Sequence, residues 1–236
     1  ISSLEAATAA LKKGEVDVLV TAPIHKKSIQ SDTFKFPGHT DYLNEQLEGD
    51  SLMFMVTDSL KVALMSDHIP LKEVVGYLNE EKINAKIASL EKSLSQDFGI
   101  QRPKIAVLGI NPHTGDNGVI GDEDDTLLTP VIKKWNEKGS LVFGPYAADG
   151  FFGNQRYTKF DGVLATYHDQ GLIPFKTLSF GQGVNFTAGL SHVRTSPDHG
   201  TAFDIAGKGV ADASSFSEAV YTARAIFLQR KEVNFS

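Results

Sequence analysis

Short apolar runs rich in β-branched residues alternate with segments of helical periodicity along this chain of 236 residues. The runs predict seven strands, at residues 16–21, 52–56, 62–65, 105–108, 141–143, 162–166 and 184–188. The helical periodicity predicts five clear helices, at residues 3–13, 40–48, 80–98, 122–137 and 215–229. Strands that alternate with helices are typical of an α/β protein with a largely parallel sheet. The runs at 52–56 and 62–65 are separated only by a short turn, so we expect an antiparallel hairpin there and a mixed sheet.

Composition and charge exclude several classes of protein. The 23 Lys and Arg residues against 29 Asp and Glu residues give a net charge of -6, which argues against a nucleic-acid-binding protein. An apolar fraction of 41% is ordinary for a folded chain with a substantial core. The apolar runs are far shorter than the ~20 residues of a membrane span. The chain has no cysteine, so any metal must be bound by His or carboxylates, and a reducing cytosolic compartment is consistent with this.

Histidines gather at the ends of the predicted strands. His25, His68, His113 and His168 each follow a strand within a few residues, and His39 lies in a loop that leads into a helix. Ligands of open α/β sheets bind at the carboxyl ends of strands, so these side chains can converge on one site. Three imidazoles would suit zinc or another borderline divalent ion. The spacing does not choose which three, and each histidine taken singly also fits an ordinary loop or helix cap.

A second candidate site lies between His168 and Gly209. Gly181 and Gly183 allow backbone amides to approach an anion, while Lys176 and Arg194 supply positive charge. Together these residues predict a phosphate-binding site. The alternative is a glycine-bearing turn with two solvated cations, because the segment lacks the spacing of a dinucleotide fingerprint.

A third polar stretch, residues 111–125, is rich in Gly and Asn and then becomes acidic. Acidic residues in the first turn of a helix interact favourably with its dipole. We therefore assign the acidic residues from Asp122 to Asp125 to helix capping.

Eight short motifs follow one another along the chain: VTAPIHK at 20–26, GHT at 38–40, DHIPL at 67–71, LGINPHTG at 108–115, YHDQG at 167–171, GVN at 183–185, RTSPDHGTA at 194–202 and IAGKG at 205–209. Taken as an ordered set, these motifs resemble the 4-hydroxythreonine-4-phosphate dehydrogenase family, whose NAD-dependent enzymes act in pyridoxal phosphate (pyridoxine) biosynthesis. The match runs from the first predicted helix to the last, and its specificity comes from many motifs in the right order.

The resemblance implies a two-lobed α/β/α fold with mixed sheets, similar to isocitrate and isopropylmalate dehydrogenases, with the active site in the cleft between the lobes. We expect residues 1–26 and 166–236 to form the lobe with the cofactor-side loop, and residues 27–165 to form the metal, substrate and dimerisation lobe. The strand and Pro/Gly-rich loop with which the family begins have no counterpart here. We therefore expect the family's N-terminal segment, a part of the first lobe, to be missing.

The resemblance also implies a set of ligands and site residues. One divalent metal ion per site, with zinc expected first and magnesium or cobalt as alternatives, is bound in the family by histidines that match His68, His113 and His168, the third coming from the partner subunit of a homodimer. Residues that match the family's substrate contacts are His39, Thr40, Lys176, Asn185 and Arg194. The NAD contacts are expected from a segment similar to the adenosine-binding loop of isocitrate dehydrogenases, at His199, Gly200 and Thr201.

The implied reaction is the NAD-dependent oxidation of the secondary hydroxyl of 4-phosphooxy-L-threonine in the cytoplasm, followed by decarboxylation to 3-amino-2-oxopropyl phosphate. Candidates for the general base are Asp169, Lys26 and metal-bound water, although Asp169 equally fits a role in orienting a metal ligand. His25 and His192 receive no role. Three alternatives stay open: a sister dehydrogenase for 4-phosphoerythronate or 4-phosphothreonate, a zinc-dependent hydrolase or lyase without NAD, and an inactive ligand-binding fragment.

Overall fold

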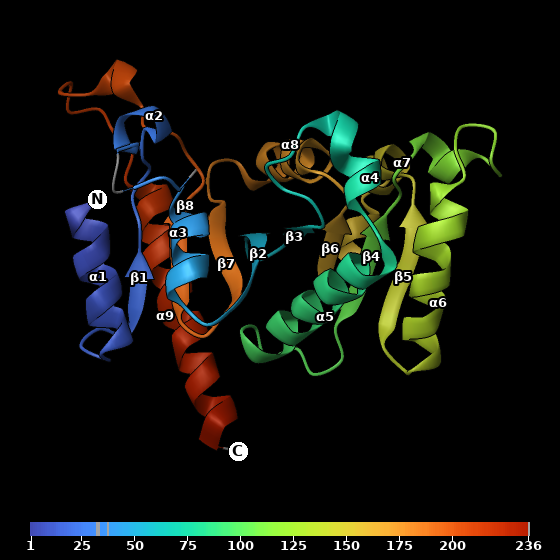
Figure 1. Cartoon of the computed structure of the whole chain (residues 1–236), viewed down its shortest axis with the longest axis horizontal. Coiled ribbons are helices and arrows are strands. Elements are labelled where there is room, and N and C mark those ends of the chain that lie inside the picture. Colours follow the sequence, from blue (N-terminus) through green and yellow to red (C-terminus); the bar gives the residue numbers. More distant parts are fainter. Residues whose placement is uncertain (32–33, 37, 236) are drawn as a thin grey trace. The chain divides into compact units, whose positions relative to one another are not determined.

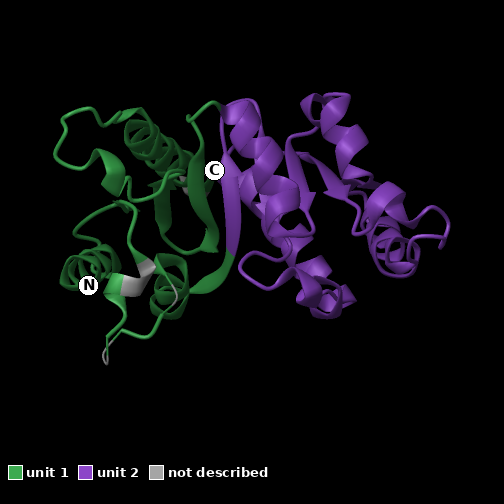
Figure 2. Cartoon of the chain, turned by 90° about the horizontal axis from the view of Figure 1, so that it is seen from above, with its two compact units in different colours: residues 1–51, 180–236 green, residues 52–179 purple. Residues whose placement is uncertain are grey.

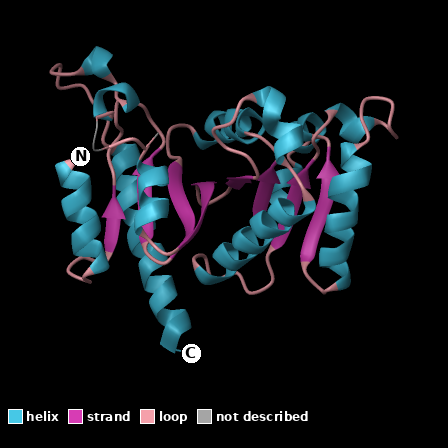
Figure 3. Ribbon diagram, viewed as in Figure 1, coloured by secondary structure: helices cyan, strands magenta, loops and turns pink. Residues whose placement is uncertain are grey.

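The computed structural model describes residues 1–31, 34–36 and 38–235, without the side chains of residues 26, 27, 234 and 235. The chain divides into two compact units, the first formed by residues 1–51 and 180–236 and the second by residues 52–179 (Figure 2). Strands alternate with helices along most of the chain (Figure 3). This order confirms the α/β class with a mixed sheet.

The first unit contains three hydrogen-bonded strands in the order β1 (Val18–Val20), β8 (Val193–Pro197) and β7 (Val184–Leu190). β1 runs parallel to β8, whereas β7 and β8 are antiparallel. The sequence pattern did not predict β8, because Arg194, Thr195 and Ser196 interrupt the expected alternation. All five residues of β8 are nevertheless buried.

Helices cover the strands of the first unit. α9 (Ser214–Phe235) packs against β1, β7 and β8, and α1 (Ser2–Lys12) packs against β1 (Figure 1). The short helices α2 (Lys26–Ile29) and α3 (His39–Gln46) follow β1 along the chain, and a 3₁₀ turn covers Phe203–Ile205. The core of this unit is formed by Leu11, Leu19, Phe34, Tyr42, Leu43, Leu47 and Leu190.

The second unit contains strands in the order β2, β3, β6, β4 and β5, of which β2 (Gly49–Val56) begins in the first unit's residue range. The other strands are β3 (Lys61–Leu64), β4 (Lys104–Leu108), β5 (Leu141–Tyr146) and β6 (Gly162–Ala165). β2 and β3 form the expected antiparallel hairpin, and the Thr57 side chain closes its turn by accepting from the Leu60 amide at 3.0 Å. The pairs β3–β6, β6–β4 and β4–β5 are parallel.

The helices of the second unit pack on these strands. α5 (Glu80–Gln96) begins where the Asn79 side chain accepts a hydrogen bond from the Lys82 amide, and α6 (Thr129–Glu137) packs on β5. The remaining helical segments are α4 (Val74–Tyr77), α7 (Ala148–Gly153), α8 (His168–Ser179), a π-helical turn at Asp124–Leu128, and 3₁₀ turns at Leu71–Glu73, Pro112–Gly115 and Arg156–Lys159. No helix among the described residues combines the length and apolar character that a membrane span requires.

The helix α8 was not among the predicted elements, because Gly171 and Pro174 lie inside it. The glycine has a packing reason. A Cβ at position 171 would lie 2.9 Å from side-chain atoms of both Ala165 and Val62, so a larger residue would push α8 away from β3 and β6. Gly171 therefore lets α8 start close to the ends of these two strands.

The unit boundaries differ from those expected from the sequence, which were placed after residues 26 and 165. The units change at 51/52 and at 179/180. The first difference arises because α3 contributes Tyr42 and Leu43 to the core of the first unit. The second arises because α8 packs on β3 and β6 and so belongs to the second unit. The assignment of cofactor binding to one lobe and dimerisation to the other stays a prediction.

Candidate functional site

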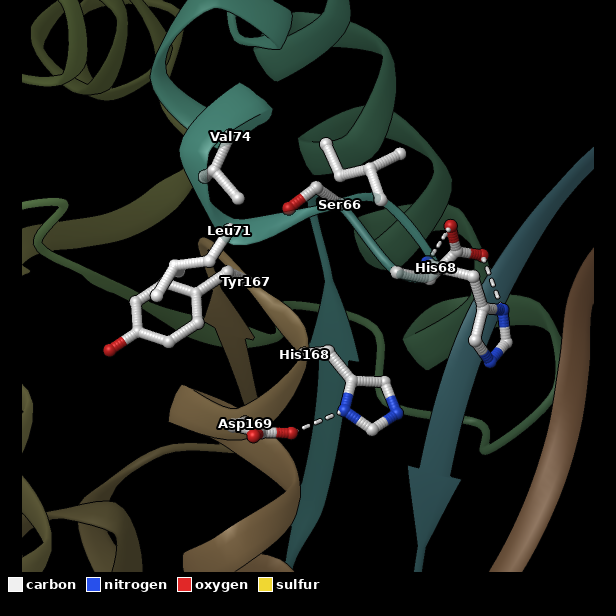
Figure 4. A pocket seen from close by; sticks show the side chains of 9 residues that line it. Ser66, His68, Leu71, Val74, Tyr167, His168 and Asp169 are labelled. Carbon is white, nitrogen blue, oxygen red and sulfur yellow. Dashed lines mark hydrogen bonds and ion pairs between the residues drawn. The ribbon is translucent and has the colours of Figure 1, made fainter.

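A pocket of ≈ 330 Å³ opens in the second unit beside the carboxyl ends of β3 and β6 (Figure 4). The chain segments that follow these parallel strands supply most of its lining, as expected for an α/β sheet. The lining residues are Ser66, Asp67, His68, Ile69, Leu71, Val74, Tyr167, His168 and Asp169.

Two of the three predicted metal ligands meet at this pocket. The ring centroids of His68 and His168 are 5.6 Å apart, and Figure 4 shows the two rings beside one another. The Nδ1 atom of His168 lies 2.7 Å from Oδ1 of Asp169, and Nδ1 of His68 lies 3.9 Å from Oδ2 of Asp67. The Asp169 carboxylate at Nδ1 of His168 favours the tautomer with an unprotonated Nε2, which is the form that can bind a metal. This donor set fits a borderline divalent ion such as zinc.

His113, the remaining predicted ligand, lies in the 3₁₀ turn after β4. Within the part of the chain that the structure describes, no three His, Asp or Glu residues are close enough to hold a metal ion. The structure thus brings together His68 and His168 in one chain and leaves His113 outside this pair. The resemblance assigned the third histidine to a partner subunit, and which subunit supplies which ligand stays a prediction.

The loops that carry these histidines are joined by buried and partly buried hydrogen bonds that the sequence pattern did not predict. Ser66 donates to the carbonyl of Thr166 at 2.7 Å, and the hydroxyl of Thr166 donates to the carbonyl of Gly109 at 3.2 Å. Gln170 accepts from the Thr166 amide at 2.8 Å and donates to the Gly109 carbonyl at 2.6 Å. These bonds fix the ends of β3, β6 and β4 relative to one another. For Ser66 and Thr166 the sequence signal was their position just after β3 and β6, whereas Gln170 lies inside α8.

The two side chains predicted as candidates for the general base are Asp169 and Lys26. Asp169 is 71% exposed and contacts the ring of His168, which favours the alternative role of orienting this imidazole. Lys26 begins α2, but its side chain lies outside the described part of the structure.

The first unit contains a buried arginine at the predicted phosphate-binding position. Arg194 in β8 is only 4% exposed, and burial lowers the pKa of its guanidinium to about 10, so it stays charged at neutral pH. Its Nε and NH2 groups donate to Oγ1 of Thr21 at 3.2 and 2.6 Å, and NH1 donates to Oγ1 of Thr187 at 3.0 Å. Among the ion pairs between described residues, none includes Arg194.

Within the described part of the chain, the side-chain hydrogen bonds of this guanidinium go to neutral hydroxyls. A buried charge of this kind is costly unless an anion compensates it. The two threonines occupy three of its five N–H donors and fix the orientation of the planar group. Thr21 and Thr187 are thus further candidate residues. For Thr21 the sequence signal was its position directly after β1.

His39 begins α3 and is followed by Thr40, both half-buried. Burial is the main cause that lowers the pKa of His39 to about 4, and the positive charge of Arg194 acts in the same direction. The ring is therefore neutral at pH 7 and can both donate and accept a hydrogen bond.

This pKa predicts a specific dependence of stability on pH. The pKa of His39 in the folded protein, about 4, lies below its ordinary value of 6.5. As the pH falls, the unfolded chain binds the proton first, so the stability that is fully present above pH 6.5 is lost as the pH falls toward 4. Urea unfolding between neutral pH and about pH 4 should show a weaker pH dependence for His39→Gln than for the wild type. The control His192→Gln should retain the wild-type pH dependence, and equal curves for all three proteins would contradict the assignment.

The other predicted site residues lie at the following places. Lys176 is exposed in the last turn of α8 in the second unit, and Asn185 is half-buried in β7 of the first unit. His199, Gly200 and Thr201 are exposed in the loop after β8. Their roles stay predictions. His25, which received no role, packs edge-on against Phe203 with ring centroids 5.7 Å apart.

The assignment of Asp122 to Asp125 to helix capping is wrong for Asp124. This residue is fully buried, and its carboxylate accepts hydrogen bonds from the amides of Ile110 and Asn111 instead of from its own helix. The burial could not be seen in the sequence, because an acidic run before a helix is also what a solvated first turn contains.

The mixed sheet, its helical layers and its two units are those of an α/β protein with the isocitrate and isopropylmalate dehydrogenase-like fold, as in the solved structures that it matches. The family model described as "Pyridoxal phosphate biosynthetic protein PdxA" matches residues 1–223, and the chain belongs to this family.

Individual relatives agree with this family. The chain is 50% identical over 233 residues to a 4-hydroxythreonine-4-phosphate dehydrogenase of Bacteroides thetaiotaomicron. This match covers 98% of the chain and 64% of the relative. A crystal structure of 4-hydroxythreonine-4-phosphate dehydrogenase from Klebsiella pneumoniae matches with a TM-score of 0.82 and 39% identity, over 95% of this chain and 69% of that chain. The chain thus spans about two thirds of the length of the relatives that it matches.

Proposed function

We propose that the complete protein is an NAD-dependent dehydrogenase that oxidises the secondary hydroxyl of 4-phosphooxy-L-threonine and releases 3-amino-2-oxopropyl phosphate. The observation that carries this proposal is the 50% identity, across 98% of the chain, with a relative named 4-hydroxythreonine-4-phosphate dehydrogenase. A hydride passes from the carbon bearing the hydroxyl to NAD⁺, the hydroxyl proton passes to a base, and a β-keto acid forms. The bond to its carboxyl carbon then breaks, CO₂ leaves, and the enolate that remains takes up a proton at the same carbon to give the product.

The buried arginine supports an anionic substrate. Arg194 lacks a carboxylate partner among the described ion pairs and holds a fixed charge at 4% exposure, so a phosphate or carboxylate of the substrate would supply the missing negative charge. His39, kept neutral by burial, would add a hydrogen bond without adding a second positive charge. Thr40, Asn185 and Lys176 are proposed as further substrate contacts, and residues 199–201 as contacts to NAD.

The imidazole pair supports a divalent metal. We propose that His68, His113 and His168 bind it, with one of the three histidines supplied by the partner subunit of a homodimer. When bound by these histidines, such an ion would supply Lewis-acid chemistry that favours loss of the hydroxyl proton and decarboxylation. Asp169 would orient His168 through the contact of 2.7 Å, which leaves Lys26 and metal-bound water as the candidates for accepting the hydroxyl proton.

The test is NADH formation by the complete gene product with NAD⁺, zinc and 4-phosphooxy-L-threonine, followed by its absorbance. The complete product is needed because the chain spans only about two thirds of the length of its relatives. We expect NADH and CO₂ to form in equal amounts and a strong chelator to abolish both.

The same assay includes the competing substrates. NADH formation with 4-phosphoerythronate or 4-phosphothreonate but not with 4-phosphooxy-L-threonine would replace the proposed substrate by a sugar-acid or hydroxy-acid phosphate. Hydrolysis or elimination without NADH would overturn the dehydrogenase assignment itself.

A further inference from the structure

The loop that carries His113 has an unusual backbone. Six consecutive residues from His113 to Gly118 have positive φ, with values between 45° and 87°, and four of them are not glycine. L-residues adopt the left-handed region mostly singly, because Cβ then approaches the neighbouring carbonyl oxygen. Such a run persists only where the surrounding structure determines it, and strained backbone of this kind gathers at functional sites.

One buried carboxylate holds the start of this loop. Asp124 is 0% exposed, its Oδ1 atom accepts from the Ile110 amide at 2.8 Å, and its Oδ2 atom accepts from the Asn111 amide at 2.9 Å. Oδ2 also lies 3.1 Å from the donating Nδ2 atom of Asn111. Asp124 opens a π-helical turn, a rare conformation that recurs at functional sites. Its carboxylate is thus satisfied by donors from Ile110 and Asn111, three and two residues before His113.

Two close approaches leave the loop little freedom. A Cβ at Gly115 would lie 2.2 Å from the carbonyl oxygen of Gly121, and a Cβ at Gly109 would lie 2.8 Å from Oδ1 of Asp124. The carbonyl of Gly109 also accepts from Gln170, two residues after His168. One continuous set of hydrogen bonds therefore links the α8 end that carries His168 to the loop that carries His113.

We propose that Asp124 is a positioning residue for His113. By binding two successive backbone amides, Asp124 holds residues 110–118 in the strained conformation and fixes the direction in which the His113 imidazole is offered to the metal. Asp124 does not itself touch metal or substrate. The inference rests on the proposed function, because it assigns His113 to the metal site.

The test is metal affinity, measured on the complete protein by competition between zinc and a chromophoric chelator. Asp124→Asn keeps the side-chain shape but turns one acceptor into a donor that faces backbone N–H groups. We expect the zinc affinity to fall about 10- to 100-fold, the range found when partners of metal ligands are changed. Asp125→Asn is the matched control, since it makes the same change at the exposed neighbouring residue and should leave the affinity unchanged.

A double-mutant cycle separates positioning from a general structural role. If Asp124 acts through His113, Asp124→Asn should lower zinc affinity no further in a His113→Ala background. An equal loss in both backgrounds, or wild-type affinity in Asp124→Asn, would overturn the inference while leaving the dehydrogenase proposal intact. Absence of zinc binding by the wild type would instead overturn both this inference and the proposed metal site.

A milder variant covers the case in which Asp124→Asn does not fold. Asn111→Ala removes the Nδ2 donor and keeps both backbone bonds to Asp124. It should lower the zinc affinity in the same direction by a smaller factor, and again only when His113 is present. Unchanged affinity in this variant, with Asp124→Asn unfolded, would count against the positioning role.

Discussion

Replacing Arg194 by methionine is expected to lower kcat/KM of the complete enzyme by roughly 100- to 1,000-fold, which corresponds to about 3–4 kcal/mol. Methionine fills much of the same volume but has neither charge nor N–H donors. A substrate phosphate or carboxylate would then enter a buried site without a compensating charge. Steady-state NADH kinetics, together with the inhibition constant of inorganic phosphate, measure the effect.

The stability of the same variant provides an independent readout. Arg194 is 4% exposed without a carboxylate partner among the described ion pairs, so removing its charge removes a desolvation cost. We expect the unliganded Arg194→Met protein to unfold at the wild-type temperature or above it. Loss of activity together with retained stability would separate substrate binding from a structural role. An unchanged kcat/KM would show that this arginine does not bind the substrate.

Two further variants locate the source of the effect. Arg194→Lys keeps the charge but lacks the planar group that Thr21 and Thr187 orient, so its kcat/KM should lie between those of the wild type and Arg194→Met. Thr21→Val keeps the guanidinium and removes the hydroxyl that accepts two of its hydrogen bonds. Its loss of kcat/KM should be smaller than that of Arg194→Met.

Much of the fold follows from local patterns in the sequence. The strands β1 to β7 all overlap their predicted ranges, because each is a short β-branched run between turns or helices. The hairpin of β2 and β3 follows from the short turn between two apolar runs. The elements that were missed are those in which tertiary contacts override local preference. β8 carries Arg194 inside a buried strand, and α8 contains Gly171 where the helix approaches β3 and β6.

The candidate site shows the same division. The positions of His68 and His168 after two strands could be predicted from the sequence, and the parallel pairing of β3 with β6 explains why they meet. The positions of Thr21 and Thr166 after strands were visible in the sequence, but the partners of the supporting groups were not. Thr21, Gln170 and Asp124 bind backbone atoms or side chains distant in sequence. A buried Asp and a solvated Asp have the same local sequence context. Their difference appears only when the fold shows which amides face the carboxylate.

Replacing His168 by alanine is expected to reduce the bound metal of the complete protein to well below one ion per site and to lower kcat by about 1,000-fold or more. The estimate follows from the several kcal/mol that a metal ion contributes to stabilising charge in a transition state. In this variant His68 would keep its contact with Asp67 but would lose the His168 imidazole, whose ring centroid lies 5.6 Å from that of His68. Metal content measured by elemental analysis after dialysis, together with NADH kinetics, tests both parts.

The matched control for this variant is His192→Ala, which removes an imidazole whose Nδ1 atom lies 2.9 Å from the hydroxyl of the neighbouring Ser191. It should keep the metal content and the rate of the wild type.

Asp169→Asn gives a graded version of the same experiment, because it weakens the acceptor at Nδ1 of His168 without removing a ligand. We expect the metal affinity of Asp169→Asn to lie between those of the wild type and His168→Ala. If His168→Ala retains both metal and activity, the pocket between His68 and His168 is not the metal site. If it retains metal but loses activity, His168 acts on the substrate and the metal ligands must be sought elsewhere in the chain.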